Sequence, residues 1–354
     1  MFEYVAYTLL KIICVVLPLL GMVAYAVLVE RKVSAFIQDR VGPNRVGPGG
    51  ILQPLADGFK FLLKEDYTPD HVRKVYFWLA PAIAMIPSLL TIAVIPFGSN
   101  LGRQKMVIAD LNVGILYTFG IVSLGVYGIV LAGYAANSKY PFLGGIRSSA
   151  QMISYEIAMG MSVIPVFMII GSLRLSDVIA YQAQNGWLAL PFMSPNQTAS
   201  TYLLWPFTLL SFAIFIVAAF AETNRLPFDL PESETELVGG YHTEYSSLKF
   251  GLFFMGEYAA MIAISAMMVV LFLGGWTLPI SGWYEPARTP LMGVAHIAVF
   301  LLKLALLMLL FIWVRWMLPR FRYDQLMDLG WRRFIPVALA NIVATALVLW
   351  FRSA

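Results

Sequence analysis

Eight long apolar stretches, separated by polar segments, dominate the hydrophobic pattern of the chain. Each is long enough to cross a bilayer as a helix, which takes about 20 residues. The pattern therefore predicts an all-α polytopic membrane protein that forms a single membrane domain over residues 1–354. Its transmembrane helices are expected at about residues 7–29, 76–97, 113–136, 152–172, 204–222, 250–273, 294–315 and 334–351.

A shorter segment, residues 51–65, predicts a helix of a different kind. Its apolar residues recur at helical spacing on one face, and its charged residues lie elsewhere on the wheel: Leu52, Leu55, Phe59 and Leu62 against Asp57, Lys60 and Lys64. This pattern is typical of an amphipathic helix that lies in the membrane interface. The preceding residues 41–50 are rich in Gly and Pro and predict irregular backbone.

Basic residues are distributed unequally between the polar segments. Segments 30–75, 137–151, 223–249 and 316–333 contain 8, 2, 2 and 4 Lys or Arg, sixteen in all, whereas the intervening loops contain 2, 1 and 1. Loops rich in Lys and Arg stay in the cytoplasm during membrane insertion. The distribution therefore predicts that these four segments are cytoplasmic and that both termini are periplasmic.

The composition indicates that lipid surrounds the chain and excludes nucleic acid as a partner. The chain is 60% hydrophobic and only 12% charged, whereas a soluble domain has about 25% charged residues. The net charge of +4 is too small and too scattered for a nucleic-acid surface. We therefore expect membrane lipid around the chain and no nucleic-acid partner.

Residues that hold metals or redox groups are scarce. Cys14 is the only cysteine, and the three histidines lie far apart in the sequence. One thiol cannot hold an iron–sulfur cluster or a structural zinc ion, and no nucleotide-binding glycine motif is present. We expect no metal site, no cofactor bound by this chain and no redox centre. Any electrons must then come from a partner.

Four ionisable residues interrupt the predicted membrane spans: Glu156, Glu222, Glu257 and Lys303. Such residues are costly in lipid and by default mark a pathway or a site. The three glutamates lie at a similar depth near the cytoplasmic ends of their helices, where carboxylates can exchange protons near neutral pH. They therefore indicate a shared proton route. For Lys303, the alternative is a static pair with one glutamate that fixes helix packing.

The predicted cytoplasmic loop 223–249 extends this set of acids. Between residues 221 and 245, one basic residue, Arg225, stands against Glu222, Asp229, Glu232, Glu234, Glu236 and Glu244. A solvated acidic loop is the alternative, but the Pro, Phe and Leu residues of the loop indicate packing. So dense a group is stable only if some members are protonated or face cations. The first predicted cytoplasmic segment, residues 30–75, which we call the first loop, offers such cations in Arg31, Arg40 and Arg45.

Three segments resemble one family: residues 30–65, 221–260 and 315–336 are similar to the H subunit of respiratory complex I, the homologue of mitochondrial NADH dehydrogenase subunit 1. The most specific strings are ETNRLPFD and PRFRYDQLM, and the similarity runs through nearly the whole chain. The resemblance implies a membrane subunit of proton-translocating NADH:quinone oxidoreductase in a bacterial inner membrane, or alternatively the mitochondrial one. This subunit would form much of the quinone chamber and link quinone reduction to proton pumping.

The resemblance also implies the partners and the site. Quinone would be the substrate, and iron–sulfur clusters and FMN would lie in partner subunits. The partners would be the hydrophilic quinone-module subunits and small membrane-arm subunits. We expect no catalytic residue in this chain. The quinone chamber would include Arg31, Arg45, Asp57 and Asp229, although Arg45 could instead face lipid or a partner. The proton link would include Glu156, Glu222, Glu232, Glu234, Glu236, Glu257 and Lys303.

Three other functions fit parts of the pattern. A homologous membrane subunit of a membrane-bound hydrogenase shares the scaffold but uses no NADH. A stand-alone ion transporter could use the buried glutamates, but it should show discontinuous helices or an internal repeat, and the sequence shows no clear repeat. A purely structural scaffold would leave four membrane-buried charges without a role.

Overall fold

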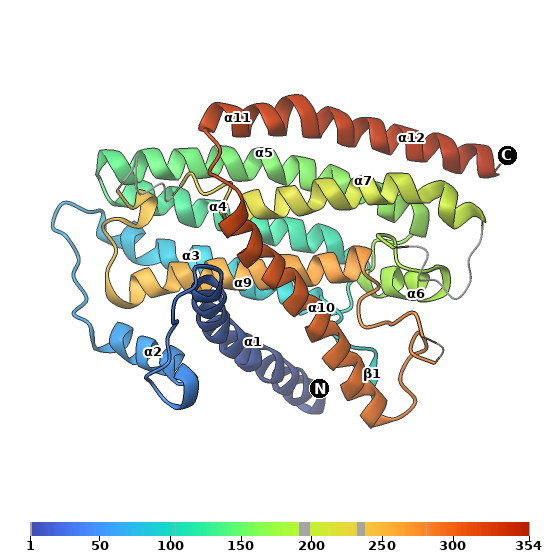
Figure 1. Ribbon diagram of the computed structural model, residues 1–354, viewed down its shortest axis with the longest axis horizontal. Helices are drawn as coiled ribbons and strands as arrows, with labels where there is room; N and C mark the ends of the chain where they lie inside the picture. The colour runs from blue at the N-terminus through green and yellow to red at the C-terminus, as the bar shows by residue number, and fades with distance from the viewer. Residues whose placement is uncertain (1, 103, 191–198, 232–237, 281, 354) are drawn as a thin grey trace.

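The computed structural model describes residues 2–102, 104–190, 199–231, 238–280 and 282–353. In these segments, eight helices are long and apolar enough to cross a membrane, which confirms the predicted all-α polytopic fold (Figure 1). They are α1 (Phe2–Ile37), α3 (Lys74–Thr91), α4 (Gly114–Ala135), α5 (Lys139–Ile170), α7 (Ala199–Glu222), α9 (Ser247–Phe272), α10 (Pro290–Met317) and a C-terminal run made of α11 (Tyr323–Asp328), a π-helical turn (Leu329–Phe334) and α12 (Ile335–Ser353).

The shorter elements lie between these helices. They are α2 (Gln53–Leu63), α6 (Leu175–Asn185), the 3-10 turns Pro48–Gly50, Ile92–Val94 and Gly240–His242, and the antiparallel strands β1 (Asn100–Leu101) and β2 (Gln104–Lys105). Residues 53–63 therefore form a helix where the sequence predicts one. The apolar side chains of α2 are exposed, and its place in the membrane interface stays a prediction.

The helix α1 continues to Ile37, well past the end of its apolar run at residue 29. The residues that continue it, beginning with Glu30 and Arg31, are good helix formers, so the helix extends beyond the stretch that hydropathy detects. It stops just before Asp39, whose backbone is left-handed (φ 51°). As a result, Glu30 is held rigidly on a helix instead of lying in a loop.

The helix α5 begins at Lys139, so most of the predicted loop 137–151 is helical. Pro141 lies in its first turn, where a missing N–H is tolerated. Gly144 lets this end of α5 approach the turn Gly240–His242: a Cβ on Gly144 would lie 2.9 Å from the backbone nitrogen of Tyr241. The early start of α5 therefore brings the predicted loop 223–249, which we call the fifth loop, against it.

The helix α9 forms the centre of the bundle. In its most apolar stretch 72% of the residues are buried, against 17% in α1 and in the C-terminal run. It packs against α3, α1, α10 and α7, while α5 packs against α4, α7 and α12. Gly256 allows the close approach of α9 to α3, since its Cβ position lies 3.2 Å from the Cα of Met85. Figure 1 shows α12 running along α5 and α7 at one edge and α1 at the opposite edge.

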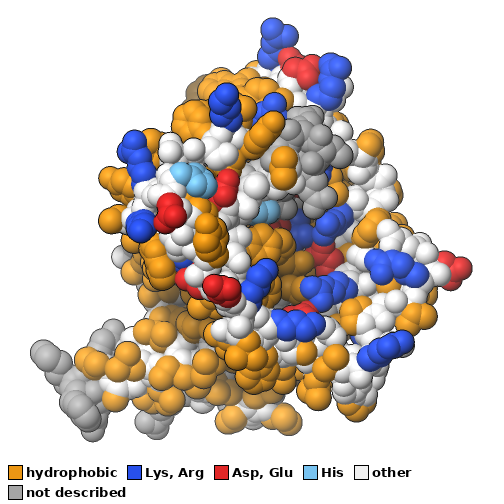
Figure 2. All heavy atoms as spheres, turned by 90° about the vertical axis from the view of Figure 1, so that its left-hand side faces the viewer, with side chains coloured by type: hydrophobic (Ala, Val, Ile, Leu, Met, Phe, Trp, Pro, Cys, Tyr) orange, Lys and Arg blue, Asp and Glu red, His pale blue; other side chains and the backbone are white. Residues whose placement is uncertain are grey.

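The polar segments gather at two opposite ends of the bundle (Figure 1). The left-hand end of Figure 1, which we call the basic end, is formed by residues 38–73, 136–138, 223–231, 238–246 and 318–322. Figure 2 looks onto this end and shows Lys and Arg side chains spread over it, with Asp and Glu between them. Both chain ends point toward the other end.

Candidate functional site

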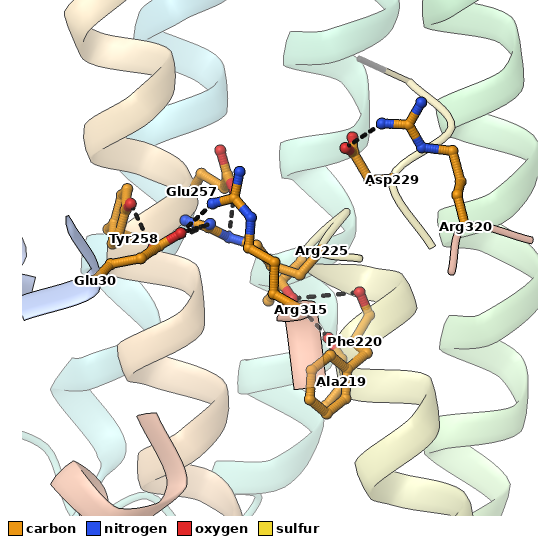
Figure 3. A network of polar contacts seen from close by, with 10 residues as sticks. Glu30, Ala219, Phe220, Arg225, Asp229, Glu257, Tyr258, Arg315 and Arg320 are labelled. Carbon is orange, nitrogen blue, oxygen red and sulfur yellow. Dashed lines mark hydrogen bonds and ion pairs between the residues drawn. The ribbon is translucent and has the colours of Figure 1, made fainter. Parts of the chain in front are cut away.

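A cluster of buried charges lies between α1, α9, α10 and the turn that follows α7 (Figure 3). We call it the Arg225 cluster; its members are Glu30, Arg225, Glu257, Tyr258 and Arg315. Arg225 lies between the two carboxylates: its Nη1 is 3.0 Å from Oε1 of Glu30, and its Nε is 2.6 Å from Oε1 of Glu257. The cluster thus joins four segments that are far apart in the sequence.

Glu30 has three partners in the cluster. Besides pairing with Arg225, its carboxylate accepts a hydrogen bond of 2.7 Å from the Tyr258 hydroxyl and pairs with Arg315. The guanidinium carbon of Arg225 lies 4.5 Å from the centre of the Tyr258 ring, in cation–π contact. Glu30 is 5% exposed and Arg225 8%, so this pair is largely out of water, whereas the side chain of Arg315 is 40% exposed and joins the cluster from its open side.

The protonation of Arg225 is fixed by its neighbours. Burial by itself would lower the pKa of Arg225, but the carboxylates of Glu257 and Glu30 raise it above its ordinary value. Arg225 is therefore a permanent positive charge. Removing one partner from such a pair leaves an uncompensated buried charge, which is strongly destabilising.

A compact turn presents Arg225 to the cluster. The backbone N–H groups of Thr223 and Arg225 donate to the carbonyls of Ala219 and Phe220 at 3.1 Å each, which closes the end of α7. Asn224 adopts a left-handed conformation (φ 50°), which Asn tolerates better than most residues. The N–H of Phe228 then donates to the Arg225 carbonyl at 2.8 Å, so the chain turns sharply around Arg225.

A second ion pair lies beside the cluster, between Asp229 Oδ2 and Arg320 Nη2 at 2.9 Å (Figure 3). In the same region, the N–H of Phe321 donates to the Pro227 carbonyl at 3.1 Å. The ring of Phe321 also packs against that of Phe228, with the centroids 5.3 Å apart. The segment before α11 therefore holds the fifth loop in place.

The buried glutamates meet at a cavity of about 90 Å³. Glu222 and Glu257 both line it, together with polar side chains from α3, α4 and the turn after α7: Ser88, Thr91, Thr118 and Asn224. Both carboxyl oxygens of Glu222 are buried and have no hydrogen-bond partner within the described part of the chain. Glu156 accepts a hydrogen bond from Ser123 and lies near enough for its charge to act on Glu222. The structure thus brings Glu156, Glu222 and Glu257 together.

The predicted quinone-chamber residues of the first loop lie at the basic end. Arg31 Nη1 is 2.7 Å from Asp57 Oδ2, and Gln53 donates to the other carboxylate oxygen of Asp57 at 2.8 Å. This pair connects the end of α1 to α2. Arg45 is exposed in the irregular segment between them.

The cations that meet the acids differ from those expected. Arg31 pairs with Asp57, and Arg40 donates to Gln38, both within the first loop. Among the described acids of residues 221–245, Asp229 pairs with Arg320, and Glu244 lies 4.0 Å from His71. Arg225 and Arg315 pair with acids of the neighbouring helices α1 and α9. Three acids of the predicted proton link lie outside the described residues: Glu232, Glu234 and Glu236.

Lys303 lies apart from the three glutamates. Its ammonium donates to three backbone carbonyls just after α9, at 2.6, 2.9 and 2.6 Å: those of Leu273, Gly275 and Thr277. It also lies 3.9 Å from the centre of the Trp187 ring. From Glu257 to the end of α9, the helix rises about 22 Å. In the part of the chain that the structure describes, the Lys303 ammonium therefore donates to backbone carbonyls and pairs with no carboxylate.

No metal site is found in the described segments: no three His, Cys, Asp or Glu side chains there could hold an ion together. The side chains of the Arg225 cluster can bind anions, donate hydrogen bonds and respond to charge. The cavity lined by Glu222 and Glu257, which we call the acid cavity, contains carboxyl groups that can take up and release protons.

Several residues of the site were not singled out from the sequence: Glu30, Tyr258 and Arg315 of the cluster, and Arg320 of the ion pair beside it. Glu30 directly follows the first apolar run, a position where charges are ordinary, and Arg315 ends another. The available signal was Arg225, the single cation among six acids, but its partners among the described residues, Glu30 and Glu257, lie outside that set. The residues that complete its cluster come from helices whose packing the sequence alone does not specify.

Comparison with known proteins identifies relatives over the whole chain. A family model described as NADH dehydrogenase matches residues 10–346. The chain is 49% identical to the H subunit of NADH-quinone oxidoreductase from Rhodospirillum centenum, covering 96% of this chain and 93% of that protein. It is 45% identical to an H subunit of the same enzyme from Koribacter versatilis, with 96% of each covered. It is 47% identical to one from Geobacter metallireducens, with 98% of each covered. The similarity therefore includes every segment that forms the Arg225 cluster.

Proposed function

The chain belongs to the NADH dehydrogenase family, and from that premise we propose how its buried charges take part in quinone reduction. It is a membrane subunit of NADH-quinone oxidoreductase, respiratory complex I, and so part of an enzyme complex. It is a multi-pass protein of the inner membrane. The proposal concerns what this subunit contributes to the complex.

The basic end forms part of the quinone chamber. Its supports are the polar side chains at this end, the pairs Arg31–Asp57 and Asp229–Arg320, and the exposed Arg45. A quinone headgroup needs a few polar donors, and its tail needs apolar walls. The exposed apolar face of α2, lying in the membrane interface, offers such a wall beside the pair Arg31–Asp57.

The Arg225 cluster transmits the charge change of the reaction to the acid cavity. Partner subunits, which would carry the iron–sulfur clusters and FMN, supply two electrons, and the quinone takes up two protons to become a quinol. Arg225 is permanently charged and contacts Glu257 directly. A change in its position or in the field around it therefore alters the proton affinity of a carboxyl that lines the cavity.

The acid cavity starts the route to the proton-pumping part of the complex. The single observation that carries this proposal is that Glu257 and Glu222 line the same cavity. Glu257 pairs with Arg225, whereas the carboxyl oxygens of Glu222 have no hydrogen-bond partner among the described residues. Most of the cavity lining is apolar, but the cavity has room for a few water molecules beside the polar groups of Glu222, Glu257, Ser88 and Thr91. Glu156 continues the route across α5 toward α4. Lys303 lies outside this route.

The orientation follows from the distribution of basic residues. We place the basic end in the cytoplasm and both termini in the periplasm, because Lys and Arg are retained on the cytoplasmic side. The quinone chamber then faces the hydrophilic quinone-module subunits. Small membrane-arm subunits cover part of the apolar surface that this chain exposes by itself.

Substituting Glu257 in the assembled complex tests the proposal. We expect Glu257→Gln to lower the rate of NADH:quinone reduction by about tenfold or more, because the carboxyl that pairs with Arg225 and lines the cavity can no longer ionise. NADH:ferricyanide activity, which does not require quinone, should stay unchanged and reports the amount of complex. Normal quinone turnover together with a normal ratio of protons to electrons in an assembled Glu257→Gln complex would contradict it.

Co-purification tests the partners. A tag at the C-terminus, extraction in mild detergent and identification of the co-purifying proteins should yield a large assembly with flavin and iron–sulfur subunits. Co-purification with a nickel–iron enzyme and no NADH oxidation would instead support the hydrogenase alternative.

A further inference from the structure

Gln151 on α5 contacts both ends of the turn that carries Arg225. It is 0% exposed, and its side-chain nitrogen lies 2.7 Å from the Ala221 carbonyl and 2.8 Å from the Phe228 carbonyl. The same nitrogen is 3.2 Å from the side-chain oxygen of Asn224. An amide group has two protons to donate, so the two backbone carbonyls account for both.

These two carbonyls flank Arg225 in the sequence. Ala221 belongs to the last turn of α7, where backbone carbonyls have no partner within the helix, and its carbonyl also accepts a long hydrogen bond of 3.3 Å from the N–H of Asn224. Phe228 lies just beyond the sharp turn. By donating to both, one side chain ties the two ends of the turn together at a fixed separation. In the described segments, no other side chain is seen to donate to either carbonyl.

The neighbouring turn of α5 supports the same contact surface. Tyr155, one helical turn after Gln151, packs its ring edge-on against Phe228, with the centroids 5.3 Å apart. The Tyr155 hydroxyl donates to the Leu326 carbonyl at 2.8 Å. One face of α5 therefore holds the Arg225 turn through Gln151 and holds α11 through Tyr155.

We propose that Gln151 is the positioning residue of Arg225: by holding the Ala221 and Phe228 carbonyls, it sets the place of the guanidinium between Glu30 and Glu257. This inference rests on the proposed function of the Arg225 cluster. Gln151 forms no hydrogen bond with Arg225 itself and acts only through the turn. Without it, the turn keeps its own backbone hydrogen bonds and the ring contact of Phe228 with Tyr155 but loses its hydrogen bonds to α5, so Arg225 no longer holds both carboxylates.

Gln182 on α6 offers a matched control. It is 1% exposed, and its side-chain nitrogen donates to the carbonyls of Val270 and Leu271 at 2.8 and 3.2 Å. It therefore makes the same type of contact in an equally buried place. However, it lies at the end of α9 remote from the Arg225 cluster.

The test compares Gln151→Met with Gln182→Met in the assembled complex. Met is similar in length to Gln but cannot donate, so each variant leaves two carbonyls without their donor. Gln182→Met also leaves the N–H groups of Leu188 and Gly274 without their acceptor, so it is the more severe of the two changes to local packing. We expect both variants to reduce the amount of complex, measured as NADH:ferricyanide activity. Per complex, Gln151→Met should lower kcat/KM for quinone by about tenfold, whereas Gln182→Met should leave it unchanged. Equal kinetic effects of the two variants would overturn the inference.

A double variant separates positioning from general packing. Arg225→Lys keeps the positive charge but lacks the planar fork that spans two carboxylates. If Gln151 acts through Arg225, adding Gln151→Met to Arg225→Lys should cause little further loss of kcat/KM. If the two losses multiply, Gln151 does not act through Arg225 and the inference is wrong. If Arg225→Lys by itself leaves quinone kinetics and proton stoichiometry unchanged, the proposed function of the cluster fails instead.

Discussion

Individual residues in the Arg225 cluster are coupled because they share a small, water-poor volume. Arg225 is held by two carboxylates, and Glu30 is held by two guanidinium groups and one hydroxyl. Each side chain is therefore a neutralising partner of another. A substitution at one member changes the charge balance of the whole group, so its effect is expected to exceed that of an exposed ion pair.

Glu30→Gln should impair the complex although it lies in no conventional catalytic motif. After this change the cluster contains two guanidinium groups, those of Arg225 and Arg315, but only one carboxylate, that of Glu257. Breaking a buried pair costs about 3–5 kcal/mol, so we expect either loss of assembled complex or loss of quinone turnover. Both are measured by comparing NADH:quinone with NADH:ferricyanide activity in membranes. The control is Glu285→Gln, which breaks the exposed pair with Arg288. An effect of Glu30→Gln no larger than that of the control would contradict the role of the cluster.

Lys303→Met tests whether the buried lysine has a structural role. The change leaves the carbonyls of Leu273, Gly275 and Thr277 without the ammonium donor, at a cost of about 1–3 kcal/mol for each group left unsatisfied. We expect a lower Tm of the detergent-solubilised complex, with quinone kinetics per complex unchanged. The control is Lys139→Met at an exposed position. An unchanged Tm with altered proton stoichiometry would instead place Lys303 in the proton link.

Sequence reasoning identified the buried glutamates and Arg225, but not Glu30 and Arg315, which complete the Arg225 cluster. Glu156, Glu222 and Glu257 stand out because they interrupt apolar runs, where any charge needs a reason. Glu30 and Arg315 lie at the ends of such runs, where charges are common and carry no signal. Which ends meet depends on how α1, α9 and α10 pack, and apolar periodicity alone does not determine that packing.

At the scale of elements, hydropathy locates the helices but not their ends. The eight predicted spans correspond to eight helices in the described chain. Yet α1 and α5 extend well beyond their apolar stretches at the basic end. Hydropathy measures contact with lipid, whereas a helix ends where its backbone hydrogen bonds end. These extensions matter, because they hold Glu30 and Gln151 in fixed positions.

Gly144→Ala should disturb the contact between α5 and the fifth loop. The added Cβ would lie 2.9 Å from the Tyr241 nitrogen and 3.0 Å from the Gly240 Cα, so backbone must move. We expect a loss of stability of about 1–3 kcal/mol, seen as a lower Tm or less assembled complex. Gly160→Ala on the same helix is the control, since its Cβ position has no neighbour within 4 Å. Equal behaviour of the two variants would show that this close approach is unimportant.

The whole molecule is polarised between its two ends. The basic end contains the Arg225 cluster and the first-loop ion pair, while both chain ends point the other way. The alternation of loop charge predicted this arrangement without any knowledge of helix packing. It could not indicate that α9 lies at the centre, because several apolar helices look alike in sequence until their neighbours are known.

Cysteine labelling tests the orientation. In a Cys14→Ser background, Gln184→Cys should react with a membrane-impermeant maleimide added to intact cells with a permeable outer membrane. Lys139→Cys at the basic end should react only after the inner membrane is opened. Both positions are exposed. The reverse pattern would place the basic end in the periplasm.

The Arg225 cluster also has a consequence for synthesis of the chain. Glu30 enters the membrane with the first helix, but its partners Arg225, Tyr258 and Arg315 lie 195, 228 and 285 residues later. During translation, the Glu30 carboxylate must therefore wait, without these partners, until most of the protein has been made. The cluster acts as a completion mark: a nascent chain that stops before Arg225 keeps an unsatisfied acid at the start of its bundle. Chains truncated after residue 222 should be degraded faster than the same truncations carrying Glu30→Gln, as pulse–chase labelling would show. Equal lifetimes would mean that the unpaired carboxylate is not what marks an unfinished chain.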